Sequence, residues 1–136
     1  MDDELVILLL YVDDLFLTGN EKQIAECKKK LTEELKMKDI GLMHYFLELE
    51  VWQSSEGIFL NQGKYAVETL KRFDMLDCKS MDTPMDTNLK LSSNESSELV
   101  DVTQYRQIIG SLMYLTNTRT YIFFVVNNLS KHLVKS

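Results

Sequence analysis

An apolar run that ends in two adjacent acids is the feature that most constrains this chain. Residues 5–11 read Leu-Val-Ile-Leu-Leu-Leu-Tyr, and a second apolar run, residues 15–17, follows Asp13 and Asp14. A continuous apolar run of this length is typical of a strand that is covered on both faces. We therefore predict a hairpin that carries the two aspartates at its turn.

The pair Asp13 and Asp14 is a candidate metal site. Like charges on neighbouring residues repel each other unless a cation lies between them. Magnesium prefers hard oxygen ligands and binds one or two carboxylates together with water and substrate phosphates. The residues alone also allow a second interpretation, because aspartate is favoured in turns for the hydrogen bonds it makes to its own backbone.

Composition limits the class of protein. With 136 residues, 45% of them hydrophobic, the chain can form a single globular domain with a core. Its net charge of −6, from 21 acidic and 15 basic residues, is opposite to that of a domain that binds nucleic acid by itself. Cys27 and Cys78 lack the spacing of a zinc site, which favours free thiols in an intracellular protein.

No membrane partner is expected. The apolar stretch of residues 5–17 contains two aspartates and is shorter than the roughly 20 residues needed to span a bilayer. Acidic residues at positions 2–4 stand where a signal peptide would carry positive charge.

Further along the first half, the pattern predicts one helix and two strands. Asn20 is a candidate N-cap, and a helical stripe of Ile24, Cys27, Leu31 and Leu35 continues to about Met37. Residues 43–52 change to period two, which predicts a strand with Tyr45, Leu47, Leu49 and Val51 on one face. Residues 54–57 then form a turn into a short strand, residues 58–60.

The second half is predicted to be helical. A helix follows Asn61 with a stripe of Ala66, Leu70 and Phe73. Residues 76–101 are polar and contain the single proline, which indicates a long loop. Helical spacing returns at Tyr105, Ile108, Ile109, Leu112 and Met113, and a last helix is expected over residues 121–133. The predicted fold class is α+β, with an antiparallel sheet and a packed helix followed by further helices.

Several motifs resemble one family in order along the chain. Leu8-Leu9-Leu10-Tyr11-Val12-Asp13-Asp14-Leu15, with Leu17-Thr18-Gly19-Asn20, resembles the catalytic hairpin of copia-type retrotransposon reverse transcriptases. Later segments are similar to the same family: Met37-Lys38-Asp39-Ile40-Gly41, His44-Tyr45-Phe46-Leu47, Gly57-Ile58-Phe59-Leu60-Asn61-Gln62, Thr83-Pro84-Met85, Tyr105-Arg106-Gln107 and Ile109-Gly110-Ser111-Leu112-Met113-Tyr114. The resemblance covers nearly the whole chain.

The resemblance implies part of a right-hand RNA-directed DNA polymerase from a Pol polyprotein. Residues 1–60 would be the second part of a palm-type sheet, with a catalytic and a primer-grip-like hairpin, and residues 61–136 a helical thumb. Asp13 and Asp14 would be catalytic ligands of Mg²⁺ or Mn²⁺ in the intact enzyme, in a turn with Tyr11 and Val12. The partners would be an RNA template and a DNA primer, in cytoplasmic particles.

The resemblance also implies two further contacts. Lys38 would lie near nucleotide phosphates, although a solvated lysine that complements the dipole of the helix end is an alternative. Phe46, Leu47 and Glu48 would form the primer grip. Glu48 stands where the family usually has glycine, and its carboxylate would repel phosphate.

Other features distinguish this chain from an intact polymerase. Thr120 and Tyr121 replace the family's usual Pro-Asp, which loosens a helix start. The family's third catalytic aspartate and its fingers lie upstream of the segments matched here, so we expect the isolated chain to be inactive and its uncovered apolar strand to self-associate. The competing hypotheses are a non-enzymatic retrotransposon remnant that acts as an interaction module, and a nucleic-acid surface at residues 28–30, three lysines that are otherwise a solvated face.

Overall fold

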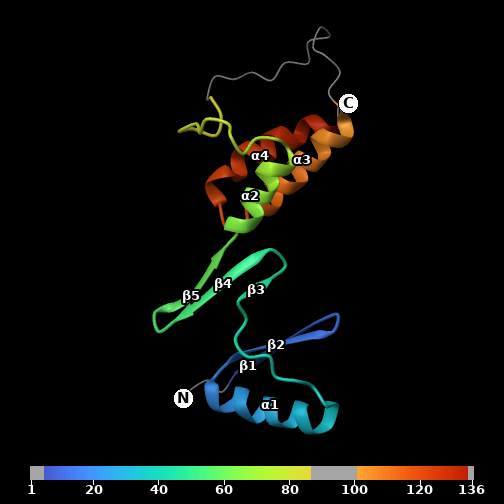
Figure 1. The fold of residues 1–136 in the computed structure, drawn as a ribbon, viewed down its shortest axis with the longest axis vertical. Helices are drawn as coiled ribbons and strands as arrows, with labels where there is room; N and C mark the ends of the chain where they lie inside the picture. The colour runs from blue at the N-terminus through green and yellow to red at the C-terminus, as the bar shows by residue number, and fades with distance from the viewer. Residues whose placement is uncertain (1–4, 87–100, 135–136) are drawn as a thin grey trace. The chain divides into compact units, whose positions relative to one another are not determined.

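Among the described residues, five strands and one helix come first in the chain, and only helical segments follow them (Figure 1). The computed structural model describes residues 5–86 and 101–134. The chain divides into two compact units, residues 1–42 and residues 43–136. Antiparallel strands and separate helices confirm the predicted α+β class. The boundary between palm and thumb at residue 60 concerns functional domains and stays a prediction.

The first unit begins with the predicted hairpin. Strands β1 (Val6–Tyr11) and β2 (Asp14–Gly19) pair antiparallel. Their register leaves Val12 and Asp13 as a two-residue turn, because Tyr11 is the partner of Asp14. At the other end, Gly19 has φ +141°, and a Cβ there would lie 2.2 Å from the carbonyl oxygen of Leu5. Only glycine fits this close approach.

Helix α1 (Glu21–Leu35) follows and packs against β2. The side chain of Asn20 accepts a hydrogen bond from the Lys22 amide at 3.0 Å, which confirms the predicted N-cap. The helix ends two residues earlier than predicted because Lys36 adopts a left-handed conformation with φ 52°. Of the expected stripe, Leu35 is exposed, whereas the other three residues are half-buried: Ile24, Cys27 and Leu31.

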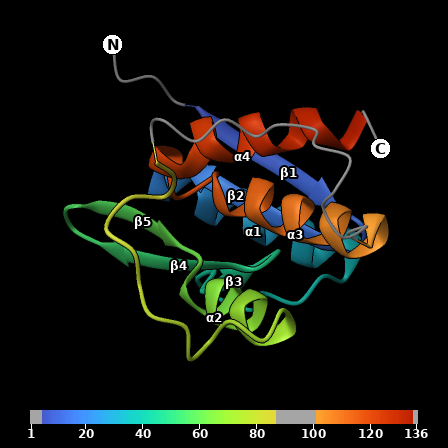
Figure 2. The ribbon, with the colours of Figure 1, turned by 90° about the horizontal axis from the view of Figure 1, so that it is seen from above.

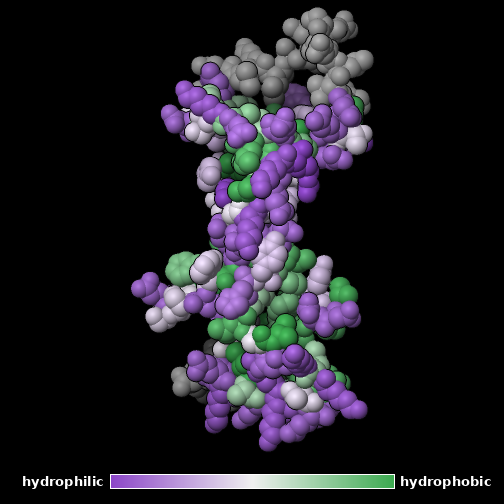
Figure 3. Space-filling view, viewed as in Figure 1, coloured by the Kyte–Doolittle hydropathy of each residue, from purple (hydrophilic) through white to green (hydrophobic). Residues whose placement is uncertain are grey.

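Strand β1 is uncovered by the described part of its own unit. Among residues 5–42 that the structure describes, none is buried, and Leu8 and Leu10 are 49% and 65% exposed. Figure 3 shows hydrophobic side chains gathered on the surface over this hairpin. The cover that such an apolar strand needs on both faces must come from another segment.

The second unit contains a three-stranded antiparallel sheet of order β3-β4-β5. Its strands are β3 (Tyr45–Phe46), β4 (Leu49–Ser54) and β5 (Gly57–Asn61). The single strand predicted over residues 43–52 is therefore wrong, since a two-residue turn at Leu47 and Glu48 reverses the chain. The turn at residues 55–56 and the strand that follows it are confirmed.

The Leu47–Glu48 turn also changes which side chains share a face. Cross-strand partners point to the same side of a sheet, and here Tyr45 pairs with Glu50. Tyr45 therefore does not share a face with Val51, as a continuous strand would require. Val51 is 3% exposed and belongs to the core.

Both residues of this turn have left-handed backbone conformations, with φ 46° at Leu47 and 62° at Glu48. Glycine adopts this conformation without the steric cost that a Cβ imposes. In a Tyr45→Phe background, which lacks the hydrogen bond from the Tyr45 hydroxyl to Glu48, we expect Glu48→Gly to raise the free energy of unfolding by about 1 kcal/mol, measured by urea denaturation. The matched control is Glu56→Gly in the turn between β4 and β5, where φ is not positive. A stabilisation by Glu56→Gly equal to that by Glu48→Gly would contradict the role of turn conformation.

The described residues that follow β5 contain five helical segments: α2 (Gly63–Arg72), α3 (Val102–Leu115), η1 (Thr120–Ile122), α4 (Phe123–Ser130) and η2 (Lys131–Val134). Helix α3 packs against α2, α4 and η2 (Figure 2), and α2 also contacts β4. Four apolar residues are buried in the described part of this unit: Val51, Ile109, Leu115 and Val126. The last predicted helix is confirmed, with 3-10 turns at both ends.

The predicted helical stripes are partly wrong. Leu70 is 42% exposed, and Thr69 is the buried residue of α2. Met113 of α3 is 44% exposed, whereas Ile109 is buried as expected. A side chain's burial here depends on the neighbouring helices as well as on spacing along one helix.

Residues 76–86 form no helix or strand, as predicted for the polar loop, and residues 87–100 of that loop lie outside the described residues. Asp101 ends it by capping α3, where its carboxylate accepts hydrogen bonds from the amides of Thr103 and Gln104. In the described part of the chain, none of the helices has the length and apolar character needed to cross a membrane.

Candidate functional site

The tip of the β1–β2 hairpin presents two adjacent carboxylates to solvent. Asp13 is the second turn residue, Asp14 is the first residue of β2, and both are exposed. The first turn residue, Val12, has φ 51°. A β-branched residue rarely adopts this conformation, and such strained backbone is concentrated at functional sites. The structure thus brings Tyr11, Val12, Asp13 and Asp14 together, as predicted.

The donor set at this turn suits a hard divalent cation in part. Two carboxylates supply oxygen ligands, and Mg²⁺ completes its octahedron with water and substrate phosphates. Within residues 5–86 and 101–134, no cluster of three or more His, Cys, Asp or Glu side chains could hold a metal ion. Cys27 and Cys78 are free thiols, as expected. Among the described residues, Asp13 and Asp14 therefore form a site of two carboxylates without a third His, Cys, Asp or Glu ligand.

Lys38 is exposed and lies beyond the end of α1. The last turn of α1 itself contains no basic residue, and the exposure of Lys38 agrees with the alternative of a solvated lysine beyond the helix end, so both interpretations of Lys38 stay predictions. Its neighbour Asp39 is held by the Gly41 amide at 2.9 Å and by the Lys28 ammonium at 2.9 Å. The Gly41 hydrogen bond, followed by the one from Lys28, lowers the pKa of Asp39.

The predicted primer-grip residues lie around the second strained turn. The Tyr45 hydroxyl donates a hydrogen bond to the Glu48 carboxylate, and the Tyr114 hydroxyl donates one to the carbonyl oxygen of Leu47. The Lys64 ammonium lies 5.3 Å from the centre of the Tyr45 ring. Phe46, Leu47 and Glu48 are therefore at a hairpin tip, where strand periodicity did not place them.

The hydrogen bond between Tyr45 and Glu48 is expected to make the stability of the folded chain depend on pH. It raises the pKa of Tyr45 from 10.0 to about 12. Because the pKa in the folded chain is the higher one, the stabilisation is fully present below pH about 10 and is lost as the pH rises through about 12. The difference in tyrosinate absorbance between the unmodified chain and Tyr45→Phe should show this late titration. Glu48→Gln should move the transition toward the ordinary value, and an unchanged transition would contradict the assignment.

A buried polar network behind this turn was missed by the sequence analysis. Gln62 is 0% exposed, and its amide donates to the Tyr114 carbonyl at 3.2 Å and accepts from the Thr118 hydroxyl at 2.8 Å. The rings of Tyr65 and Tyr114 are in edge-to-face contact with centroids 5.1 Å apart. Gln62 and Tyr114 lie in family-like motifs, but nothing in those motifs indicates that the two residues bond to each other, because they meet only in the tertiary fold.

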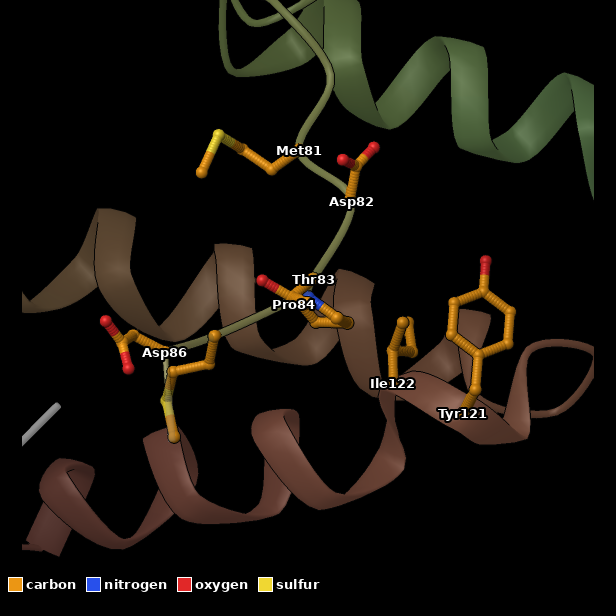
Figure 4. Close-up of a pocket in the computed structure, with 8 residues that line it drawn as sticks. Met81, Asp82, Thr83, Pro84, Asp86, Tyr121 and Ile122 are labelled. Carbon is orange, nitrogen blue, oxygen red and sulfur yellow. The ribbon is translucent and has the colours of Figure 1, made fainter. Parts of the chain in front are cut away.

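A cavity of about 830 Å³ lies between the segment after α2 and η1 (Figure 4). None of the sequence-predicted site residues lines it. Its charged lining residues are Asp82 and Asp86, without a basic side chain. This charge does not suit a phosphate-bearing ligand. Among the described residues, the two turns at Asp13 and Glu48 remain the candidate functional features.

Comparison with known families identifies the class of protein. The family described as "Reverse transcriptase (RNA-dependent DNA polymerase)" matches residues 1–87. The chain belongs to this family.

Two of its relatives are Pol polyproteins of transposons. "Retrovirus-related Pol polyprotein from transposon RE2" of Arabidopsis thaliana is 36% identical over 130 residues, which cover 95% of this chain and 9% of the relative. The corresponding polyprotein of transposon TNT 1-94 from Nicotiana tabacum is 34% identical over 143 residues, with 97% of this chain and 11% of the relative covered. The predicted resemblance to a retrotransposon reverse transcriptase is confirmed.

A shorter relative is the "Uncharacterized mitochondrial protein AtMg00810" of Arabidopsis thaliana, 42% identical over 121 residues, which cover 88% of this chain and 50% of the relative. The chain thus spans half or less of the length of these three relatives. No solved structure matches it.

Proposed function

We propose that this chain supplies the catalytic hairpin and the thumb of a reverse transcriptase that synthesises DNA on an RNA or DNA template. The observation that carries this proposal is the strained turn that presents Asp13 and Asp14 at a hairpin tip in a chain of this family. Members of the family generally use divalent metal ions, which agrees with two carboxylates at adjacent positions. Nucleic-acid substrates and an intracellular location in cytoplasmic particles are parts of the same proposal.

In the proposed mechanism, the hairpin holds the carboxylates of Asp13 and Asp14 at the reacting phosphates. When bound, Mg²⁺ or Mn²⁺ would lower the pKa of the attacking 3′-hydroxyl and neutralise charge on the leaving pyrophosphate. The paired strands β1 and β2 fix the turn, so little reorganisation is needed when the substrate binds. Lys38 would lie near the phosphates of the incoming nucleotide, and the Leu47–Glu48 turn would contact the primer strand.

The proposal includes a requirement for further chain. A two-carboxylate turn lacks the third ligand that the family supplies from an upstream strand, and β1 exposes an apolar surface that a neighbouring strand would cover. We infer that the isolated chain is inactive and gains activity when the upstream palm and fingers are joined to it.

Primer extension tests this proposal. The chain joined to the upstream palm and fingers of a retrotransposon relative should extend a DNA primer on an RNA template when Mg²⁺ is present, and the 136-residue chain alone should not. If the joined protein folds and binds primer–template but adds no nucleotide with Mg²⁺ or Mn²⁺, the proposed function is wrong.

The second candidate function is a non-enzymatic interaction module. The net charge of −6 and the carboxylate of Glu48 at the proposed primer contact favour it, because both repel phosphate. Of the lysines at positions 28–30, Lys28 is already paired with Asp39, which weakens the hypothesis of an independent nucleic-acid surface. Magnesium-dependent primer extension by this chain alone would exclude the second function.

A further inference from the structure

The Leu47–Glu48 turn needs external support. Two consecutive residues that are not glycine adopt left-handed conformations there, with φ 46° and 62°. Each left-handed residue with a Cβ carries a steric cost, and such backbone persists only where its surroundings fix it. Neither Leu nor Glu is a residue that ordinary two-residue hairpin turns favour.

Two tyrosine hydroxyls contact this turn in different ways. Tyr45 lies on the adjacent strand and binds the side chain of Glu48, so its contact is local. Tyr114 lies 67 residues away on α3 and binds the main-chain carbonyl of Leu47. A hydrogen bond to that carbonyl restrains the peptide unit between the two turn residues, and therefore the dihedral angles that are strained.

Tyr114 itself is held by its surroundings. Its ring is in edge-to-face contact with Tyr65 of α2. Its carbonyl accepts a hydrogen bond from Gln62, which is fully buried and also bound to Thr118. The nitrogen and the oxygen of the buried Gln62 side chain each have a partner, and such hydrogen-bonded buried groups rigidify their surroundings. The hydroxyl therefore projects from a support built by α2, α3 and the segment after α3.

We propose that Tyr114 is a positioning residue, whose hydroxyl holds the Leu47–Glu48 turn in its left-handed conformation against α3. The turn's contact with the primer strand then depends on the arrangement of α2 and α3, a consequence that rests on the proposed function. Movement of α3 would reach the main chain of the turn through this hydrogen bond.

Amide hydrogen exchange on the 136-residue chain tests the positioning without any catalysis. The Val51 amide donates to the His44 carbonyl at 2.8 Å across this hairpin and reports its opening. Tyr114→Phe keeps the ring contact and removes the hydroxyl, and we expect exchange at Val51 to accelerate about fivefold, the effect of one net hydrogen bond.

Tyr105→Phe is the matched control, because Tyr105 also lies on α3 and its hydroxyl donates to a main-chain carbonyl, that of Leu129, at 2.9 Å. It should leave exchange at Val51 unchanged. Equal effects of Tyr114→Phe and Tyr105→Phe, or loss of the circular dichroism signal in Tyr114→Phe, would show a general structural role and overturn the proposal.

A relaxed turn provides a second test. Leu47→Asn combined with Glu48→Gly gives the residue pair that left-handed two-residue turns favour. In that background, Tyr114→Phe should change exchange at Val51 less than twofold. If Tyr114→Phe accelerates exchange at Val51 as much in this background as in the unmodified chain, Tyr114 does not act by holding the strained turn in its conformation.

The consequence for nucleic acid is tested separately in the joined polymerase described above. Tyr114→Phe should raise the KM for primer–template about fivefold while kcat changes less than twofold, because the turn contacts the primer and not the reacting atoms. A lowered kcat with unchanged KM would overturn this part. If the joined polymerase has no activity at all, the proposed function fails, whereas the exchange results still decide the role of Tyr114.

Discussion

Asp13→Asn in the joined polymerase is expected to lower kcat for primer extension by on the order of 10³-fold or more. Asparagine has nearly the shape of aspartate, so the strained turn and the β1–β2 pairing are retained while one anionic ligand is lost. The primer–template KM should change little, because the carboxylate acts on the reacting phosphates. Steady-state kinetics at saturating Mg²⁺ and at several Mg²⁺ concentrations measures both parameters.

Asp74→Asn is the matched control for Asp13→Asn. Asp74 is exposed and has φ 55°, a conformation that asparagine accepts as well as aspartate does. It should leave kcat unchanged. Extension by Asp13→Asn at the rate of Asp74→Asn would remove Asp13 from the catalytic site.

Ile7→Lys is expected to convert the isolated chain from a self-associating species to a monomer. Strand β1 pairs only with β2 in the described structure, and Ile7 is 54% exposed on it. A free edge of apolar residues pairs with other chains, and a lysine on such a strand opposes this because association would bury its charge against apolar side chains on the face of the sheet. Sedimentation velocity at increasing protein concentration should show associated species for the unmodified chain and one slow species for Ile7→Lys.

Ile40→Lys separates the effect of the edge from a general gain in solubility. Ile40 is 81% exposed, lies in the same unit and is outside any strand. It makes the same change in charge and should leave association largely intact. Equal dissociation by Ile40→Lys and Ile7→Lys would show that surface charge, and not the edge of β1, controls association.

The two turns show how far local sequence predicts this structure. The hairpin at Asp13 was predictable because a long apolar run, two acids and a second apolar run are adjacent in the chain. Asn20 was predictable as an N-cap for the same reason, since a cap acts on amides two or three residues away. The strained backbone at Val12 was not predictable, because nothing in the sequence indicates a positive φ at a β-branched residue.

The turn at Leu47 and Glu48 was missed by the sequence analysis, because the contact that supports this turn comes from a distant part of the chain. Alternation of apolar residues through this segment favours one strand, and neither turn residue favours a left-handed conformation. The hydrogen bond that fixes the turn comes from Tyr114, 67 residues later in the chain. The register of β3 and β4, and the face on which Tyr45 lies, follow from that turn.

The sequence by itself determined the α+β class, the aspartate-bearing hairpin and membership of the reverse transcriptase family, because these depend on residues that are close together in the chain or on motifs kept in order. Only the tertiary structure decided the position of the second turn, the buried partners of Gln62 and the exposure of β1. Each of these depends on which distant segments meet, and spacing along one strand or helix carries no information about such contacts.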